Sequence, residues 1–565
     1  MADGRRRRRT CRPGALLAAR PVLVALVALA APWARLSAAP GTATAAQTTA
    51  KAAARGPRLS YGVRARWVVE QNSLPGTTAW EIAPGRAGGI SGFASSTYAV
   101  EGEEVTLYVS TRARSFRVDA YRMGWYQGKG ARLVWRSRDL EGRRQPACTR
   151  AASTNMVACD NWAPSLRFEV TARFVQGDYL LELVGSGGQR SYVPLTVADL
   201  ESRSAYLVKN DVYTWQAWND YGGYDFYAGR GTCPPGVYPL CSRARVVSFD
   251  RPYAYGDGAG DFLGSEYPLV RLVEEHGLDV SYATDQTVQQ HPGILLRHRA
   301  MLSLGHDECW SLAERNAADA AEARGVNIAF FGASAILRHV RLEASPLGPD
   351  REEVDYRDSA ADPLDGKGNP LEVTGNTWAS PPASWSEVGM VGEQYAGYLD
   401  PGAAPRPLVV AAGAPSWFLR GTRLSAGSAV PGVVAADFDE YDPADHPADL
   451  EILAHSPIPL GQAVSDVGEA AGAAWADTTY WTDPASGAGI FDSGTTAWIP
   501  ALSPCPAASL AGEAGHPGSS KSCPAAVMAR LTGNLLALFG QGPAGRVAPA
   551  VSNLAKVYAP MRMAR

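Results

Sequence analysis

The chain has 565 residues, of which 53 are basic and 56 acidic, and its formal net charge is −3. This length exceeds what one hydrophobic core can hold, so we expect two or three domains. The first 45 residues contain eight arginines and one aspartate, which leaves the rest of the chain near −10. An acidic surface of this size argues against nucleic acid or an anionic membrane as the partner.

The N-terminus has the three parts of an export signal. A basic cluster, residues 5–9, precedes an apolar run at 22–31, and small residues at 43–45 offer a cleavage site. The run is shorter than the roughly 18 to 20 residues of a membrane span, so we predict a removed signal peptide over 1–45 and no membrane anchor. The protein is therefore expected to be secreted, and the export route stays open between Sec and twin-arginine.

Residues 46–59 are small and polar and predict a disordered linker. The next segment, 60–198, predicts a β-sandwich domain of immunoglobulin or fibronectin type, because short alternating strands follow one another without a helical period. The expected strands are 105–110, 116–121, 132–135, 167–170, 179–183 and 192–197.

Trp125 and Tyr126 lie within the stretch 121–132 of this segment. Two such aromatics could form a sugar-binding face on the sandwich. Aromatic side chains of this kind pack between domains more often, so we favour a domain interface.

The pattern changes to alternating strands and helices from residue 199, which predicts a doubly wound α/β domain over 199–545 and a C-terminal tail over 546–565. Carboxyl ends of parallel strands gather at one edge of such a sheet, where ligands bind. The segment 340–405 reads as loop-rich. The expected elements are strands 204–208, 278–283, 300–304, 326–331 and 430–438, helices 262–276, 287–298, 311–324 and 527–539, and a hairpin within 481–499.

Seven of the eight cysteines lie beyond the predicted signal. Six fall into close pairs in loop-like surroundings, as expected of an exported protein. We predict the disulfides Cys148–Cys159, Cys233–Cys241 and Cys505–Cys523. The remaining Cys309 is either a buried free thiol, which we favour, or a soft ligand.

The turn after strand 300–304 carries three ionisable side chains in a row, His306, Asp307 and Glu308. One interpretation is a solvated turn in which Asp307 or Glu308 caps the next helix. The other is a site at the carboxyl edge of the sheet. Tyr227, Glu308 and Asp437 could converge there, and a phenol with two carboxylates is a donor set that hard metals prefer.

The chain resembles the large-subunit family of N,N-dimethylformamidase. The segments that carry the resemblance are 121–132, 214–223, 305–310 with 325–332, and 534–536. The resemblance covers residues 60–545 and implies that the α/β domain is glutamine-amidotransferase-like. The expected fold is thus multidomain β and α/β.

The resemblance also implies a mononuclear iron held by one tyrosine and two glutamates. Carried over, Tyr227 and Glu308 match two ligands, and Asp437 stands where the second glutamate would be. His306 matches a nearby histidine, Ser334 stands where that family has an asparagine, and Asn219 is placed beside this set.

The activity implied is hydrolysis of a carbon–nitrogen bond in a small amide, with His306 and Asp307 carrying the proton to the leaving amine. The alternative is an exported binding protein for a cell-wall glycan or another protein, which keeps the fold without the chemistry. Asp437 and Ser334 favour that alternative, whereas Tyr227, His306 and Glu308 favour the enzyme. The sequence allows a homo-oligomer.

Overall fold

The computed structural model describes residues 61–83, 85–231, 239–400, 402–464, 474–504 and 524–558. They fall within one unit, Thr48–Arg565. The predicted signal peptide 1–45, the linker 46–59, Cys233, Cys505, Cys523 and the last residues of the tail lie outside the described residues.

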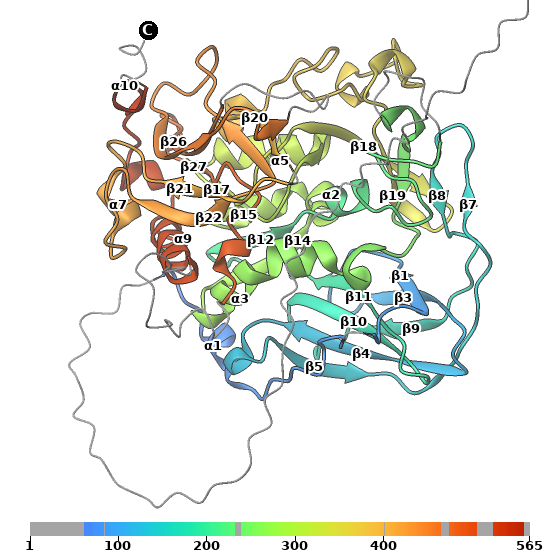
Figure 1. Ribbon diagram of the computed structural model, residues 1–565. Helices are drawn as coiled ribbons and strands as arrows, with labels where there is room; N and C mark the ends of the chain where they lie inside the picture. The colour runs from blue at the N-terminus through green and yellow to red at the C-terminus, as the bar shows by residue number, and fades with distance from the viewer. Residues whose placement is uncertain are drawn as a thin grey trace, which may run out of the picture. The chain divides into compact units, whose positions relative to one another are not determined.

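Two β-sheets built from the first third of the chain enclose a common core (Figure 1). One has the order β1-β3-β9 and the other β2-β11-β10-β4-β5, with β6 paired to β4. Leu107, Val118 and Leu181 meet in this core and are fully buried, as the alternation of their strands predicts. The strands are β1 Ile90–Ala94, β2 Tyr98–Ala99, β3 Glu104–Thr111, β4 Ser115–Met123, β5 Ala131–Arg136, β6 Leu140–Glu141, β9 Leu166–Glu169, β10 Gly177–Gly185 and β11 Arg190–Val197.

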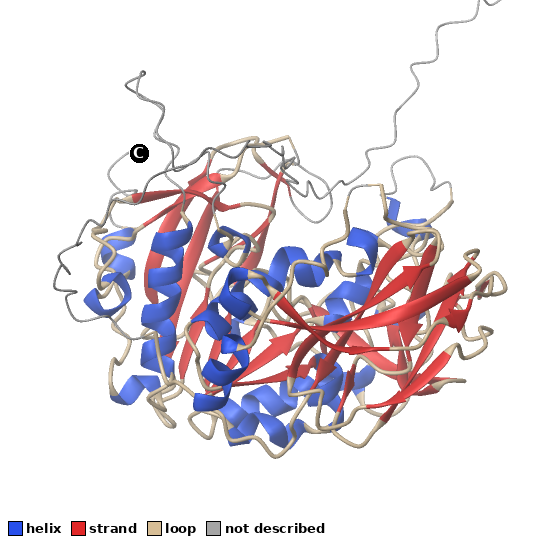
Figure 2. Ribbon diagram, turned by 90° about the horizontal axis from the view of Figure 1, so that it is seen from below, coloured by secondary structure: helices blue, strands red, loops and turns tan. Residues whose placement is uncertain are grey.

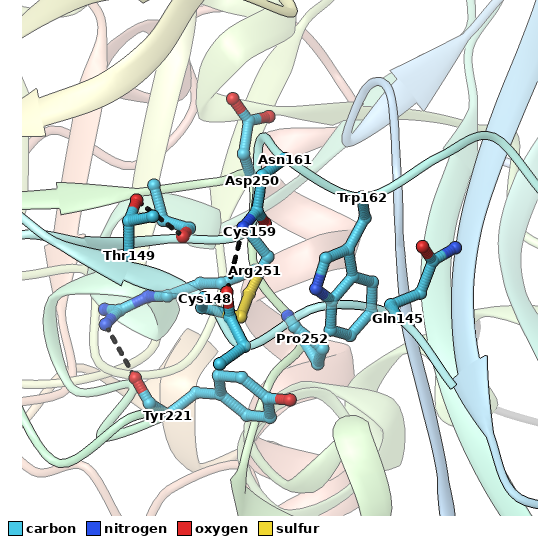
Figure 3. The surroundings of a disulfide bond; sticks show 12 residues. Gln145, Cys148, Thr149, Cys159, Asn161, Trp162, Tyr221, Asp250, Arg251 and Pro252 are labelled. Carbon is cyan, nitrogen blue, oxygen red and sulfur yellow. Dashed lines mark hydrogen bonds between the residues drawn. A yellow bond between two sulfur atoms is a disulfide. The ribbon is translucent and has the colours of Figure 1, made fainter. Parts of the chain in front are cut away.

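A disulfide joins Cys148 and Cys159 beside a short hairpin of β7 (Thr149–Arg150) and β8 (Val157–Ala158), which confirms that predicted pair. Figure 3 shows its surroundings, where the backbone N–H of Cys159 donates to the carbonyl of Asp250 over 2.7 Å. The disulfide closes a loop within the N-terminal segment, and the hydrogen bond to Asp250 joins this loop to the chain beyond residue 199. Cys241 is also disulfide-bonded.

A second joint is made by the segment after β4. Arg122 forms a buried ion pair with Glu274 of helix α3 (Tyr267–Glu275), with 2.7 Å between Nη2 and Oε1, and also donates to the hydroxyl of Tyr126 over 3.0 Å. Asn72 of helix α1 (Arg66–Ser73) accepts from the backbone N–H groups of Trp125 and Tyr126, each over 2.9 Å. Tyr126 is fully buried, so it offers no exposed ring for a sugar, and the domain interface stays a prediction.

The centre of the chain forms a seven-stranded sheet of order β14-β12-β15-β17-β27-β26-β24. Its first five strands are parallel, and β26 and β24 complete it in antiparallel fashion. Helices run alongside these strands (Figure 2). The strands are β12 Tyr206–Asn210, β14 Val280–Thr284, β15 Ala300–Ser303, β17 Asn327–Phe330, β24 Glu451–Ile458, β26 Ala474–Thr482 and β27 Gly489–Asp492.

The predicted helix over 311–324 is confirmed as α5, and Ser311 caps it by accepting from the backbone N–H of Glu314. The cap is therefore Ser311, and neither Asp307 nor Glu308 is needed for it. The predicted helix 262–276 consists of a π-helical turn, Phe262–Glu266, and α3. The helices are α1 Arg66–Ser73, α2 Val212–Ala217, α3 Tyr267–Glu275, α4 Asp285–Gln290, α5 Leu312–Glu322, α6 Val388–Val391, α7 Ser416–Leu419, α9 Ala525–Phe539 and α10 Leu554–Val557.

Two expectations about the later chain were wrong. The segment 340–405 contains a hairpin of β18 and β19, whose exposed half is polar and so lacked an apolar pattern. The strand predicted over 430–438 is two strands, because Ala436 takes a left-handed backbone conformation (φ 52°) and ends the first one. The smaller sheets contain β13 Val246–Ser248, β16 Cys309–Ser311, β18 Arg338–Ser345, β19 Gly348–Val354, β20 Gln394–Leu399, β21 Arg406–Val409, β22 Ala429–Val434, β23 Asp437–Glu440 and β25 Ala463–Val464.

Within the part of the chain that the structure describes, none of the helices has the length and apolar character needed to cross a membrane.

Candidate active site

The turn 304–308 connects β15 to β16 and carries the central side chains of the site. Gly305 has φ 66°, a left-handed conformation that glycine adopts without strain. Its carbonyl oxygen approaches Gly332, where an added Cβ would lie only 1.8 Å away. The two loops that follow β15 and β17 are therefore locked together by a pair of glycines. This contact sets His306 and Glu308 against the loop that carries Ser334.

Tyr227 reaches the same place from the loop after α2. Its hydroxyl donates a hydrogen bond to Oε2 of Glu308. The indole of Trp218 stacks on the phenol ring, with 3.6 Å between ring centroids, and its Nε1 also donates to Glu308 over 3.3 Å. The guanidinium of Arg357 lies 4.3 Å from the phenol centroid, and the stacked indole leaves it the other ring face. Tyr227 is thus held on both faces with its oxygen directed at Glu308.

Glu308 is almost fully buried, with its side chain 5% exposed, and both its side chain and its backbone are held by polar contacts. Nε of Arg338 lies 3.1 Å from Oε1, and the hydroxyl of Thr214 accepts from the backbone N–H of Glu308 over 3.0 Å. Burial by itself would raise the pKa of Glu308, but the charges of His306, Arg338 and Arg357 lower it below its ordinary value. The carboxylate is therefore ionised at neutral pH.

His306 joins Glu308 to two further predicted residues. Its Nε2 lies 2.9 Å from Oδ2 of Asp437, 2.9 Å from Oγ of Ser334 and 3.6 Å from Oε2 of Glu308. The Ser334 hydroxyl donates to the carbonyl of Ala333, so it accepts from His306. Burial opposes the charged imidazole, but Asp437 and Glu308 outweigh it and raise the pKa of His306 to about 9. His306 is therefore protonated at neutral pH.

Asp307 binds Lys209 instead of His306. Its carboxylate lies 2.7 Å from Nζ of Lys209 and accepts a hydrogen bond from Ser303. Lys209 is fully buried and also binds Asp285 and Glu314. The sequence suggested Asp307 as the partner of His306, whereas Asp437 occupies that position in the fold. His306 and Asp307 are neighbours in the chain, but their side chains contact different groups.

Asn219 and Cys309 also lie close by along the chain without joining these contacts. The amide of Asn219 donates to Gln216 over 2.8 Å and to the carbonyl of Pro252 over 3.0 Å, so it holds the loop that leads to Tyr227. Cys309 is buried and free, and burial raises the pKa of its thiol well above the ordinary value. Its interpretation as a buried free thiol is confirmed.

Sequence reasoning missed four residues that shape the site. Trp218 belonged to an aromatic segment that was noted only as a whole, and Arg338 and Arg357 fell in a stretch read as loop-rich. Asp439 accepts from the backbone N–H of Ser334 with both oxygens, each over 2.9 Å. Ser334 has φ 56°, and an acidic residue two positions after Asp437 was the one available signal for this support.

The predicted metal ligands Tyr227, Glu308 and Asp437 form a connected set with His306, which contacts both Glu308 and Asp437. Among the described residues no group of three or more His, Cys, Asp or Glu side chains is arranged to hold a metal ion. That criterion leaves out tyrosine, which here is in hydrogen-bond contact with Glu308. A phenol and two carboxylates are hard anionic donors whose combined charge would offset ferric iron. In donor chemistry these residues fit such an ion.

The sequence profile described as N,N-dimethylformamidase beta subunit-like, C-terminal, matches residues 117–511. The chain belongs to this family. No curated protein matches it. Among solved structures, murine CEACAM1b is similar at 15% identity over 19% of this chain, which spans about half (52%) of that structure, with a TM-score of 0.10. A superposition this weak carries no argument about fold or function.

The family match includes every residue of the connected set. It begins within β4 and ends after β27, so the turn 304–308, Tyr227, Ser334 and Asp437 all lie inside it. Membership therefore supports a dimethylformamidase-like hydrolase as the general class.

Proposed function

We propose that this family member is a secreted, iron-dependent amidohydrolase that cleaves a non-peptide carbon–nitrogen bond in a small amide. The supporting observation is the connected set itself. The Tyr227 hydroxyl bonds to Glu308, and Glu308 and Asp437 both lie near Nε2 of His306. Tyr227, His306 and Glu308 lie in the segments that follow β12 and β15 of the parallel strands, which is where open α/β sheets place their chemistry, and Asp437 joins them from β23.

Tyr227, Glu308 and Asp437 would hold the metal. When bound, iron would supply Lewis-acid polarisation of the amide carbonyl and a lowered pKa for water. Trp218 and Arg357 keep the phenol ring in place, while Arg338 and Trp218 keep Glu308 facing it. Preorganisation of this kind limits the movement needed during reaction.

His306 would act as the proton carrier. It holds a proton at Nε2 between Asp437 and Ser334, and the charge of Asp437 keeps the imidazole protonated near neutral pH. In hydrolysis, oxygen from water bonds to the carbonyl carbon, the carbon–nitrogen bond breaks, and the leaving nitrogen takes the proton from Nε2. A proton released by the water then restores the imidazolium. Asp437 takes the supporting role that the sequence assigned to Asp307.

Metal analysis and an assay on the purified chain test this proposal. We expect about one iron per chain, a visible tyrosinate-to-iron absorption band, and release of amine from formamide or N,N-dimethylformamide. Tyr227→Phe should remove the band while leaving the fold intact, and Tyr224→Phe, a tyrosine of the same loop, is the matched control. A chain that binds no iron after reconstitution and hydrolyses no simple amide would refute the proposal.

We also propose that the two N-terminal sheets form an immunoglobulin- or fibronectin-like sandwich and that the central sheet is glutamine-amidotransferase-like. Export is supported by the disulfide Cys148–Cys159, because disulfides persist in oxidising compartments.

The alternative is an exported binding protein that retains the fold. Asp437 and Ser334 favour it, since they replace the glutamate and asparagine that the family resemblance implies. A pull-down with insoluble cell-wall glycan, run beside the amide assay, separates the two. Glycan binding without amine release would support the alternative.

A further inference from the structure

Two carboxyl groups lie behind the turn that carries His306, and the proposed chemistry does not use them. Asp211 follows β12, and Glu266 ends the π-helical turn Phe262–Glu266 before α3. The exposed fractions are 2% for Asp211 and 0% for Glu266. Two ionised carboxylates this deeply buried would repel each other strongly and would lose their hydration.

Each acid of this pair has one carboxyl oxygen that lacks a hydrogen-bond donor in the described part of the chain. Oε1 of Glu266 accepts from the backbone N–H of Asp211 over 3.1 Å and from Nε1 of Trp215 over 2.9 Å. Oδ1 of Asp211 and Oε2 of Glu266 have no donor among the described residues. Both side chains nevertheless approach the same point, because a Cβ added at Gly305 would lie 3.2 Å from Oδ2 of Asp211 and 3.2 Å from Cγ of Glu266. Ionised carboxylates are acceptors only, so a proton held between the two groups would supply the missing donor.

The charged side chains that face the pair are acidic, so they do not supply a cation in place of the proton. Asp178 of β10 faces Glu266, while Asp307 and Asp285 face Asp211. Lys209, the cation of this region, is engaged by Asp285, Asp307 and Glu314. Burial is the largest cause that raises the pKa of both acids, that of Glu266 to about 8. The pair therefore keeps its proton at neutral pH.

Asp211 and Glu266 pack against Gly305 in the turn that carries His306. A Cβ added at Gly305 would lie 3.2 Å from Oδ2 of Asp211 and 3.2 Å from Cγ of Glu266. Gly305 immediately precedes His306 and has a left-handed backbone that depends on this close approach. A change in the separation of the two carboxyl groups would therefore move Gly305, and His306 would move with it.

We propose that Asp211 and Glu266 share a single proton and act as positioning residues for the Gly305–His306 turn, so that loss of this proton in alkaline solution displaces His306. The effect on activity rests on the proposed function, whereas the shared proton does not.

The experiment compares the wild-type chain with Glu266→Gln, whose amide can donate the hydrogen bond that the proton supplies. Asp211→Asn is the second variant if Glu266→Gln does not fold. Glu275→Gln is the matched control, because it makes the same substitution at an exposed acid at the end of α3. The readouts are thermal unfolding from about pH 6 to about pH 9, the carboxylic-acid carbonyl band in the infrared, and amide hydrolysis over the same range.

The wild type should lose stability as the pH rises toward about 8, because the native pair keeps a proton that an unfolded Glu266 releases near its ordinary pKa of 4.5. One such proton changes the folding equilibrium constant by roughly tenfold per pH unit. Glu266→Gln should lose this slope and one acid carbonyl band, and its activity relative to wild type should rise several-fold at alkaline pH. Glu275→Gln should keep the slope and the acid band.

Parallel pH profiles and an unchanged acid band in Glu266→Gln would overturn the shared proton. Loss of the slope and the band, with an unchanged pH profile of hydrolysis, would overturn the positioning role. Absence of hydrolysis in every variant and in the wild type would refute the proposed function, and the stability and infrared results would still decide the shared proton.

Discussion

Nε2 of His306 lies 2.9 Å from Oδ2 of Asp437, although the two residues belong to distant parts of the sequence. Their side chains are 22% and 17% exposed, whereas Glu308 and Ser334 are almost fully buried. The contact gives the imidazole an anionic partner, and Asp307, its neighbour in the chain, is committed to Lys209.

Asp437→Asn should lower the pKa of His306 from about 9 toward its ordinary value of 6.5, because the variant removes the charge that most favours the imidazolium. The direction is fixed by the sign of that charge. An NMR titration of the histidine ring measures the shift, and amide hydrolysis should fall by about 10²-fold or more at neutral pH. Asp442→Asn, an acid on the loop after β23, is the control. An unchanged titration of His306 would contradict the contact.

Lys209→Met should destabilise the fold by about 3 to 5 kcal/mol, because it leaves Asp285, Asp307 and Glu314 buried without their cation. Urea unfolding at neutral pH measures the change. Asp307→Asn should destabilise by less, since two anionic partners remain. A control in the exposed ion pair Arg66–Glu70, Arg66→Ala, should have little effect. If Lys209→Met unfolds at the wild-type urea concentration, the buried cluster contributes nothing to stability.

Trp218→Phe should weaken catalysis while preserving the fold. Phenylalanine retains an aromatic face for stacking on Tyr227 but cannot donate to Glu308, which Trp218 does over 3.3 Å. Loss of one hydrogen bond to a charged group corresponds to about 1.5 to 3 kcal/mol, or roughly 10- to 150-fold in rate if the bond strengthens in the transition state. Steady-state kinetics test this, with Trp417→Phe in helix α7 as the comparison variant. Equal kcat/KM values for Trp218→Phe and wild type would show that the indole N–H is dispensable.

Asp178→Asn should make stability less dependent on pH. Burial raises the pKa of Asp178 from 3.8 to about 7, against the opposing effects of Thr196, Arg122 and Asn210. The native state therefore binds this proton more tightly than the unfolded state. Its contribution is fully present below pH 3.8 and is lost as the pH rises to about 7, by up to about 1.4 kcal/mol per pH unit. The difference in unfolding free energy between the two chains, measured at several pH values, should follow this course, and a constant difference would contradict it.

The local elements of the parallel sheet were predictable because each depends on short-range patterning. Strand β17 is apolar and ends at a glycine, and α5 is rich in alanine and begins after Ser311. The break at Ala436 was not predictable, since a left-handed alanine has no compositional signal and is maintained by surrounding contacts. The hairpin of β18 and β19 was missed for a related reason, because half of its residues face solvent and resemble a loop in sequence.

For the candidate site, the sequence by itself determined the residue types and their position after a buried strand. Family resemblance then pointed to Tyr227, His306, Glu308, Asp437 and Ser334, and the fold brings these five together. Three features of the site became visible in the folded chain alone. Asp437 is the acid that contacts His306, and Arg338 is a cation that contacts Glu308. Asp211 and Glu266 lie against Gly305. These contacts join residues far apart in the chain, and their geometry follows from sheet order and loop packing, which local sequence patterns do not encode.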